Sequence, residues 1–406
     1  MTLVNESAIP VRPAGARPRL DFVDLLRGWI MILMALDHVR DFFHTNASLF
    51  EPTDLEKTYP ALFLTRWITH FCAPVFFFLA GTGAFLSLGR GKTKSNLSYF
   101  LVTRGLWLVL LELTLIKFGW TFNWNLHQYI GQVIWALGWS MVLMAALVHL
   151  PLWALTTLGA VMIAGHNLLD GIRPSAFGSF SWLWKVLHVQ SGFEILPGYN
   201  MFIVYPLIPW LGVMVVGYAF GSVLRRPQAE RRRYSFLIGL GLTVAFIFVR
   251  ALNVYGDPRP WSPQQSFLFT VFSFLNCEKY PPSLSYLLMT LGPAIIFLAL
   301  FDRDLHKMWR PILVFGRVPL LFYLLHIFVI HALAALVASV RYGKGGGLWS
   351  GPPFDPETLA TYPSAYGYGL FGVFAAWIVV LLLLYPACKW FADLKQRRRD
   401  SWLSYF

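Results

Sequence analysis

The segment from Arg19 to His44, RLDFVDLLRGWIMILMALDHVRDFFH, strongly constrains how this chain can fold. Its middle is apolar enough to cross a bilayer, for which a helix needs about 20 residues, yet both of its ends carry ionisable side chains. Charge inside a membrane span is unfavourable and often marks a functional site. Eleven positions separate Arg27 from His38, so a helix would project both from one face, about 16 Å apart along its axis. The segment predicts a spanning helix with a cation near one end and an acid–imidazole cluster, Asp37 and His38, near the other.

The composition supports an integral membrane protein with one transmembrane domain. Hydrophobic residues make up 57% of the chain and charged residues only 13%, whereas a soluble domain has about 25% charged residues. The three cysteines show neither a disulfide framework nor metal-ligand spacing. Residues 1–18 lack the apolar core of a removable signal peptide. We therefore expect an all-α polytopic domain over residues 19–393, preceded by a polar tail (1–18) and followed by a basic tail (394–406).

Apolar runs of spanning length recur along the chain, and they predict ten transmembrane helices. These runs cover residues 22–44, 66–88, 97–118, 130–149, 152–169, 199–224, 234–252, 284–301, 317–340 and 367–391.

The distribution of Lys and Arg predicts the orientation of these helices. Basic clusters precede the first run and follow the second, sixth, eighth and tenth. Basic loops stay on the cytoplasmic side of a membrane, so both termini are expected inside. The net charge of +13 is then explained by topology and by contact with lipid headgroups, not by nucleic acid. The opposite connections are rich in aromatic residues, Pro and Gly, and they include a flexible run at Gly343–Gly347.

Ionisable side chains gather in the outer half of the expected bundle. If one helix begins at Pro319, a favoured first-turn residue, His326 lies near the middle of the membrane. Glu112 is central in the third run, where a buried cation or histidine is its simplest partner. Burying the neighbours Asp37 and His38 requires a partner for each. The side chains expected to converge are His38, His70, His127, His326, His331 and Glu112.

Three arginines mark the inner side: Arg27, Arg104 and Arg317, at the inner ends of the first, third and ninth runs. One arginine there is often a snorkelling side chain. Three of them on neighbouring helices would form a site for a phosphorylated ligand, because the guanidinium group binds phosphate oxygens in a bidentate way.

Several familiar catalytic motifs are missing from the sequence. It has no Walker loop, dinucleotide fingerprint, HExxH or nucleophile elbow. A metal site made by His38, His70 and His326 has no support from their spacing, so no metal is expected.

Six stretches of the chain resemble bacterial members of the heparan-α-glucosaminide N-acetyltransferase-like family. They are RLDFVDLLRGWIMILMALDHVRDFF, THFCAPVFFFLAGTGAFL, RGLWLVLLELT, LGWSMVLMAALVHLP, LNCEKYPPSLSYLLMTLGP and FGRVPLLFYLLHI. The opening and the KYPPSL segment are the most specific. The resemblance implies an inner-membrane acyltransferase that takes an acetyl or other acyl group from cytosolic acyl-CoA. It delivers that group to a carbohydrate or glycolipid on the extracytoplasmic side of the membrane. Assembly of the chain as a homodimer is left as an alternative.

The resemblance also implies roles for particular residues. His38 would act as the general base with Asp37 orienting it, while His326 or His70 assists at the acyl carbonyl. The three inner arginines would bind the CoA phosphates, and Lys279 of the KYPPS segment would contact the acceptor or support the outer vestibule. His44 lies about 120° away from His38 on the same helix and is expected to meet water.

Two other classes of function fit the same residues. A proton-coupled exporter could use His38, Glu112 and His326 as a relay, although no repeated half is visible. A non-catalytic envelope scaffold would explain the helices but not the buried charges. A thermal shift of the purified protein with acyl-CoA favours the enzyme, and its absence at millimolar ligand favours the other two.

The topology can be tested by single-cysteine labelling with a membrane-impermeant reagent. Cysteines at Trp182 and Gly346 should react from outside, whereas cysteines at Arg231 and Arg397 should react only after the membrane is opened. Outside labelling at position 231 combined with protection at 346 contradicts the prediction.

Overall fold

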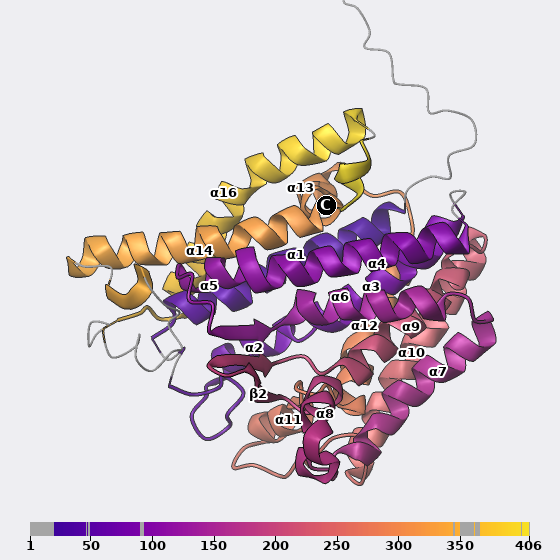
Figure 1. Cartoon of the computed structure of the whole chain (residues 1–406), viewed down its shortest axis with the longest axis horizontal. Helices are drawn as coiled ribbons and strands as arrows, with labels where there is room; N and C mark the ends of the chain where they lie inside the picture. Colours follow the sequence, from indigo (N-terminus) through magenta and orange to yellow (C-terminus); the bar gives the residue numbers. More distant parts are fainter. Residues whose placement is uncertain are drawn as a thin grey trace, which may run out of the picture.

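The computed structural model describes residues 20–45, 47, 49–89, 93–343, 346–349, 361, 366–398 and 400–405. Helices dominate this part of the chain and confirm the all-α polytopic class, with one small sheet in addition (Figure 1). The α-helices are α1 (Asp21–Phe43), α2 (Pro60–Thr69), α3 (Cys72–Leu88), α4 (Lys94–Leu111), α5 (Lys117–Thr121), α6 (Val133–Leu147), α7 (Leu152–Gly165), α8 (Ser181–Leu187), α9 (Leu207–Leu224), α10 (Gln228–Leu252), α11 (Phe267–Leu275), α12 (Leu284–Phe301), α13 (Arg310–Arg317), α14 (Pro319–Tyr342) and α16 (Leu370–Arg397). Short π or 3-10 turns are η1 (Glu112–Ile116), η2 (His166–Leu169), η3 (Pro174–Phe180), η4 (Lys307–Trp309), η5 (Gly346–Trp349) and η6 (Ser401–Tyr405).

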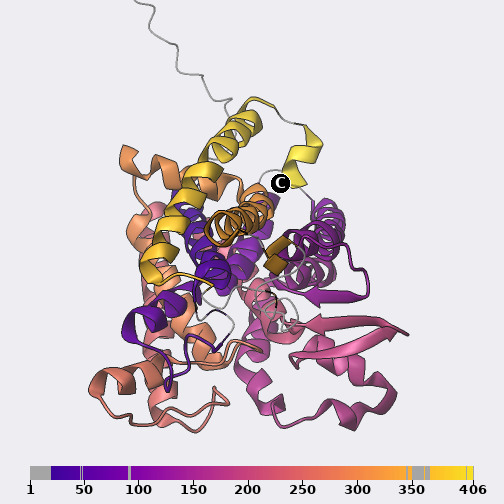
Figure 2. The ribbon, with the colours of Figure 1, turned by 90° about the vertical axis from the view of Figure 1, so that its left-hand side faces the viewer.

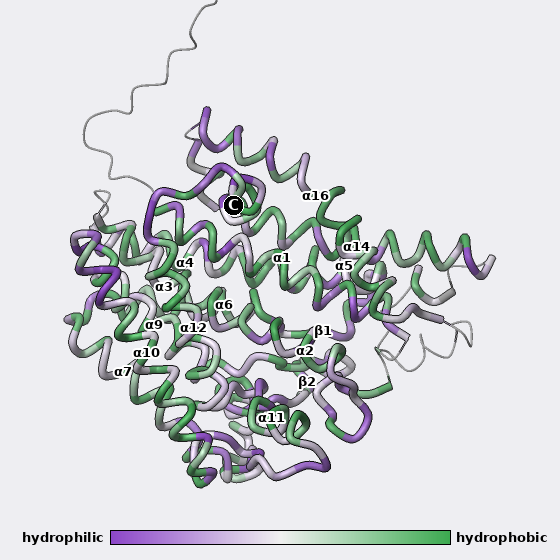
Figure 3. The backbone as a smooth tube through the Cα atoms, turned by 180° about the vertical axis from the view of Figure 1, so that it is seen from behind, coloured by the Kyte–Doolittle hydropathy of each residue, from purple (hydrophilic) through white to green (hydrophobic). Residues whose placement is uncertain are grey.

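The apolar runs of the sequence lie on these helices. Among the described residues, eight helices or series of consecutive helices are long and apolar enough to cross a membrane. Helix α6, with 15 residues, is shorter, and α1 carries five charged residues within the run of residues 22–44. The number ten and the orientation therefore stay predictions. In Figure 3, hydrophobic colours run along the helices, and hydrophilic colours gather at helix ends and in the connections.

Helix α1 lies at the centre of the molecule. Of its 23 residues 17 are buried, because it packs against α2, α3, α12, α13, α14 and α16. Helix α16 lies on one side of α1 and the sheet on the other (Figures 1 and 2). Polar side chains on α1 are thereby held inside the bundle.

A proline breaks the second predicted span into two helices. Pro74 has no N–H to bond the carbonyl of His70, four residues earlier, and its ring crowds that carbonyl. Helix α2 ends at Thr69 and α3 begins at Cys72. The freed His70 carbonyl accepts a hydrogen bond of 2.7 Å from the Tyr286 hydroxyl of α12.

A second break separates Arg317 from the helix in which it was predicted. Helix α14 begins at Pro319, as predicted, but Arg317 is the last residue of the short helix α13. Helix α13 crosses α1 with backbone against backbone: a Cβ atom on Gly316 would overlap the carbonyl oxygen of Asp24. The crossing fixes Arg317 next to the inner end of α1.

The sheet corrects the sixth predicted span, which was expected to be helical from residue 199. Residues 199–203 form a strand, and α9 begins only at Leu207, after Pro206. The strands are β1 (Gln128–Gly131), β2 (Ser191–Leu196) and β3 (Tyr199–Ile203).

This sheet sets the starting points of two helices. Strand β3 pairs in parallel with β1 and antiparallel with β2, through a hairpin that turns at Gly198 with a positive φ of 81°. Glycine adopts that backbone without steric penalty. Because β1 leads into α6 and β3 leads towards α9, the parallel pair places Val133 and Tyr205 beside each other at one end of the bundle.

The α1–α13 crossing is testable by adding one methyl group. Gly316→Ala should destabilise the purified protein by about 1–3 kcal/mol, because the backbones must separate to admit the methyl group. Gly83→Ala in α3 is the matched control, since a Cβ atom there meets nothing within 4 Å. Equal melting temperatures for Gly316→Ala and Gly83→Ala in detergent would contradict this packing.

Candidate active site

A small cavity lies beside the C-terminal half of α1, where α3, the start of α6 and the segment before α12 approach it. Its volume is about 30 Å³, which is room for about one water molecule. The residues that line it are Met34, Asp37, His38, Thr69, Cys72, Ala73, Phe76, Val133, Tyr205 and Lys279. Because it is so small, side chains must move before two substrates can meet here.

His38 and His326 are joined directly, although 288 positions separate them in the sequence. The Nδ1 atom of His38 lies 2.7 Å from Nε2 of His326. The Nδ1 atom of His326 faces the backbone carbonyl of Tyr323, so this nitrogen carries a proton and donates it. In neutral His326, Nε2 must then accept, and His38 donates through Nδ1–H. The chain of bonds leaves Nε2 of His38 unprotonated.

The surroundings of His38 hold its ring in place. His38 is partly exposed, unlike His326, which is 1% exposed. The Trp120 ring packs against the His38 ring, with centroids 4.9 Å apart. A neutral, oriented imidazole at the edge of a cavity is the form that general-base catalysis requires.

Asp37 is held by arginines rather than by the histidine that follows it. Its carboxylate lies 2.6 Å from Nη1 of Arg66 on α2 and 3.2 Å from Nη2 of Arg40. Arg40 also meets Asp41 at 2.6 Å. The hydrogen bond that orients His38, however, comes from His326 and not from Asp37.

Lys279 and Tyr205 add polar groups to the cavity wall. The Lys279 side chain is buried, with its ammonium 5.0 Å from the centre of the Tyr280 ring, and its charge acts on both Asp37 and His38. Burial raises the pKa of the Tyr205 phenol well above its ordinary value, and the neighbouring Tyr280 adds to this shift. Tyr205 therefore stays a neutral hydroxyl. A lysine and a tyrosine thus line the space beside His38, and the Tyr205 hydroxyl lies 3.5 Å from the Tyr280 hydroxyl.

His70 lies near this cluster but has another environment. Its side chain is 3% exposed and its Nδ1 atom has no hydrogen-bond partner. Its ring packs at 5.4 Å from the Tyr286 ring, and its electrostatic neighbours include Arg66 and Lys279. The contacts place it behind the cavity wall formed by Thr69 and Cys72.

Glu112 was expected to pair with a buried cation or histidine, but its hydrogen bonds are to backbone groups. Its carboxylate accepts hydrogen bonds from the backbone N–H groups of Ile134 and Trp135, at 3.2 and 3.3 Å. These N–H groups belong to the first turn of α6, where a helix leaves its donors unsatisfied and favours negative charge. Glu112 therefore caps α6 and holds it against η1.

The remaining outer histidines do not converge on the cavity. His331 lies between the carbonyls of Gly119 and Leu348. His127 bonds Asn125 and stacks on an outer tyrosine. His44 was expected to meet water, but it is 4% exposed, because residue 44 pairs with Tyr368.

The three arginines that were expected on the inner side gather at the N-terminal end of α1. Arg27 contacts Asp24 and the carbonyl of Gly316, both at 3.2 Å, and Arg317 contacts Asp21 at 3.3 Å. The cations of Arg27 and Arg104 are close enough to repel each other. Repulsion between like charges is relieved when an anion binds between them. The arginines thus sit on α1, α4 and α13, at the opposite end of α1 from His38.

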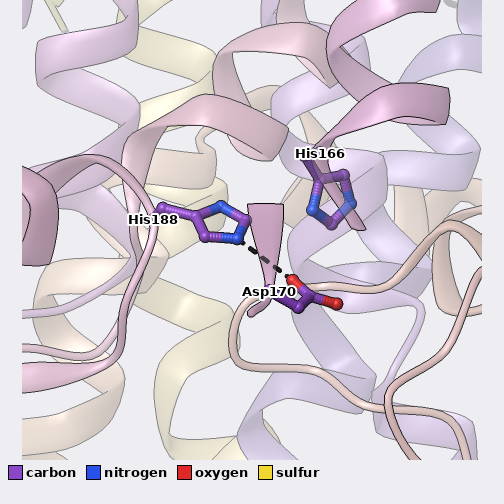
Figure 4. A group of neighbouring side chains, drawn as sticks. All are labelled: His166, Asp170 and His188. Atoms are coloured by element: carbon purple, nitrogen blue, oxygen red, sulfur yellow. Dashed lines mark hydrogen bonds and ion pairs between the residues drawn. The ribbon is translucent and has the colours of Figure 1, made fainter. Parts of the chain in front are cut away.

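One cluster escaped the sequence analysis altogether: His166, Asp170 and His188, whose side chains converge in the part of the chain after α7 (Figure 4). The signal available was the His–Asp spacing of four residues at the end of an apolar run. Arg66, the partner of Asp37, was also missed, since 29 positions separate them.

Comparison with known proteins identifies the family. The model for the catalytic domain of heparan-alpha-glucosaminide N-acetyltransferase matches residues 19–255. This is more than half of the chain, and the protein belongs to this family of membrane acetyltransferases, whose members use acetyl-CoA as donor. The matched part includes α1 with His38, while His326 and Lys279 lie beyond it. No curated protein matches the chain.

Proposed function

We propose that this protein transfers an acetyl group from cytosolic acetyl-CoA, or a related acyl-CoA, to a carbohydrate or glycolipid on the other side of the bacterial inner membrane. The family supports acetyl transfer in general. The observation that carries the finer proposal is the hydrogen-bond chain from the Tyr323 carbonyl through His326 to His38. It leaves a lone pair on Nε2 of His38, which is the group needed to activate a sugar amine or hydroxyl.

The donor is held at the inner end of α1. Arg27, Arg104 and Arg317 bind the phosphates of acyl-CoA, because three guanidinium groups present paired donors to phosphate oxygens. The pantetheine arm then runs along α1 towards His38. The distance from Arg27 to His38 along the axis of this helix is about 16 Å.

The reaction itself takes place beside His38. Nε2 removes the proton from the acceptor as its oxygen or nitrogen attacks the thioester carbonyl carbon. Negative charge develops on the carbonyl oxygen, where the Lys279 ammonium and the Tyr205 hydroxyl on the cavity wall stabilise it. The new bond to the acceptor forms as the bond to the CoA sulfur breaks, and the proton held by His38 leaves with the CoA thiol.

His326 and Asp37 have supporting roles in this proposal. His326 is a positioning residue, because it accepts the Nδ1–H of His38 and stabilises the imidazolium that forms. Asp37 fixes Arg66 and Arg40 beside the site and balances their charge. His70 keeps the backbone of the α2–α3 break tied to Tyr286.

These contacts support a proton relay in an exporter less well than they support acyl transfer. Such a relay needs a carboxylate that exchanges protons with the histidines. The Glu112 carboxylate instead accepts backbone hydrogen bonds at the start of α6.

His38 is expected to be indispensable for the chemical step. His38→Ala should lower kcat by about 10²–10⁴-fold, which is the usual contribution of a general base. His44→Ala is the control, since it makes the same truncation at a buried histidine directly after the end of α1. The assay follows CoA release with purified protein and a sugar acceptor. If His38→Ala retains near wild-type kcat while His44→Ala or His70→Ala does not, the base is misassigned.

The role of His326 can be separated from general stability by two replacements. His326→Gln keeps an oxygen able to accept the His38 Nδ1–H, whereas His326→Leu removes the acceptor. His326→Gln should therefore be clearly more active than His326→Leu at equal melting temperature. Equal activities would exclude the positioning role.

Substitution of a residue in the donor site is expected to change KM for acetyl-CoA. Arg104→Gln should raise KM for acetyl-CoA with little change in kcat, because a phosphate contact contributes equally to ground state and transition state. Arg226→Gln, an exposed arginine that pairs with Glu230, is the control. Unchanged KM in Arg27→Gln, Arg104→Gln and Arg317→Gln would rule out this donor site.

A further inference from the structure

A second group of chemically capable side chains lies outside the candidate active site. His166 opens η2 directly after α7, Asp170 follows η2, and His188 follows α8. The ligand atoms of the three residues all lie within 4.8 Å of one another. In Figure 4 the three side chains approach one another from these segments.

Two of the three side chains are deeply buried. His166 is 1% exposed and His188 is 2% exposed. The Asp170 side chain is 26% exposed and forms the open edge of the group. A buried pair of imidazoles with an accessible carboxylate leaves one direction from which water and a dissolved ion can arrive.

The protein's own hydrogen bonds do not satisfy this group. Neither ring nitrogen of His166 has a partner within hydrogen-bond geometry, and Nδ1 of His188 has none either. Only Nε2 of His188 is bonded, to Oδ1 of Asp170 at 3.0 Å. Buried polar atoms are nearly always paired, so a histidine with two unpaired nitrogens indicates a missing partner. The unpaired ring of His166 lies against the other two ligand groups.

The surroundings supply the outer support that metal sites usually have. The second oxygen of Asp170 accepts a hydrogen bond of 2.8 Å from Asn167, which fixes the carboxylate. The Pro282 carbonyl lies near the His166 ring and suits the N–H of a ligated imidazole. Asn167 in turn accepts from the backbone N–H of Leu284 at 2.9 Å. A ligand set with such orienting contacts is characteristic of metal centres.

We propose that His166, Asp170 and His188 bind one zinc ion on the outer side of this protein, with water in the fourth position. Two imidazoles and one carboxylate form a donor set that zinc favours, and hard cations such as Mg²⁺ prefer oxygen alone. Ligands of a tetrahedral zinc ion stand roughly 3.3 Å apart. The 3.0 Å between His188 and Asp170 is already close to this separation. The other separations, which are at most 4.8 Å, must shorten by up to about 1.5 Å for all three residues to bind one ion.

The zinc ion would tie three segments of the outer layer together. It joins the end of α7 to α8, and through Asn167 and Pro282 it reaches the segment that leads into α12. That segment also carries Lys279 of the active-site cavity. The site is therefore structural: it holds the outer layer in register with the cavity wall and does not touch the reacting atoms.

Zinc binding can be measured on the full chain in detergent, after removal of any affinity tag and of metal by a chelator. Calorimetry with ZnCl₂ should give one tight site per chain for the wild type. Asp170→Asn keeps an oxygen to accept from His188 but loses the charge, and it should weaken zinc binding on the order of 100-fold or more. His166→Gln should do the same. His127→Gln, in another outer loop, is the control and should bind as the wild type does.

Two results would overturn the proposal. One is a wild-type protein that binds no zinc more tightly than Asp170→Asn does. The other comes from X-ray absorption at the zinc edge of the wild type, which needs no variant to fold: a shell without two imidazoles contradicts the site. Neither result depends on acetyl transfer, so the zinc site can be contradicted without contradicting the proposed activity, and the reverse also holds.

Discussion

Helix α1 carries charged and polar side chains through the centre of an apolar bundle, and the rest of the structure is arranged to give them partners. An unpaired charge in such a place is strongly unfavourable. Asp37 therefore meets Arg66 and Arg40, and Arg27 meets Asp24 and a backbone carbonyl of α13. Arg66 belongs to α2 and the carbonyl to α13, whereas Arg40 and Asp24 lie one turn away on α1 itself. The charges of α1 thus select which segments pack around it, and a hydrophobic pattern alone would leave this choice open.

The two ends of α1 face different chemical tasks. The N-terminal end presents arginines, which suit phosphate, and the C-terminal end presents an imidazole near a buried lysine. In the function that we propose, an acyl carrier with a charged head and a long flexible arm spans the distance between these ends. Such an arrangement lets the donor stay on one side of the membrane while the acceptor approaches from the other. The cavity of about 30 Å³ implies that the side chains around His38 move apart when the substrates enter.

Sequence reasoning succeeded where local rules decide the structure. The apolar runs identified the long helices, and Pro319 marked the start of α14. It failed where distant segments meet. Nothing in the spacing of residues predicts that His38 bonds His326, or that Glu112 caps α6 rather than pairing with a charge. The strand at 199–203 was predicted as helix, because the periodicity of a short apolar run does not distinguish a buried strand from a buried helix.

The central claim is that one acyl-CoA molecule reaches from the inner arginines to His38. The most direct measurement is a cryo-electron microscopy map of the protein with a thioether analogue of acetyl-CoA, which cannot transfer its acyl group. The account predicts phosphate density at Arg27, Arg104 and Arg317. It also predicts the acyl carbonyl within about 3–3.5 Å of Nε2 of His38, the separation from which transfer proceeds. Nucleotide density at the outer end of α1, or an acyl group directed away from His38, would contradict it.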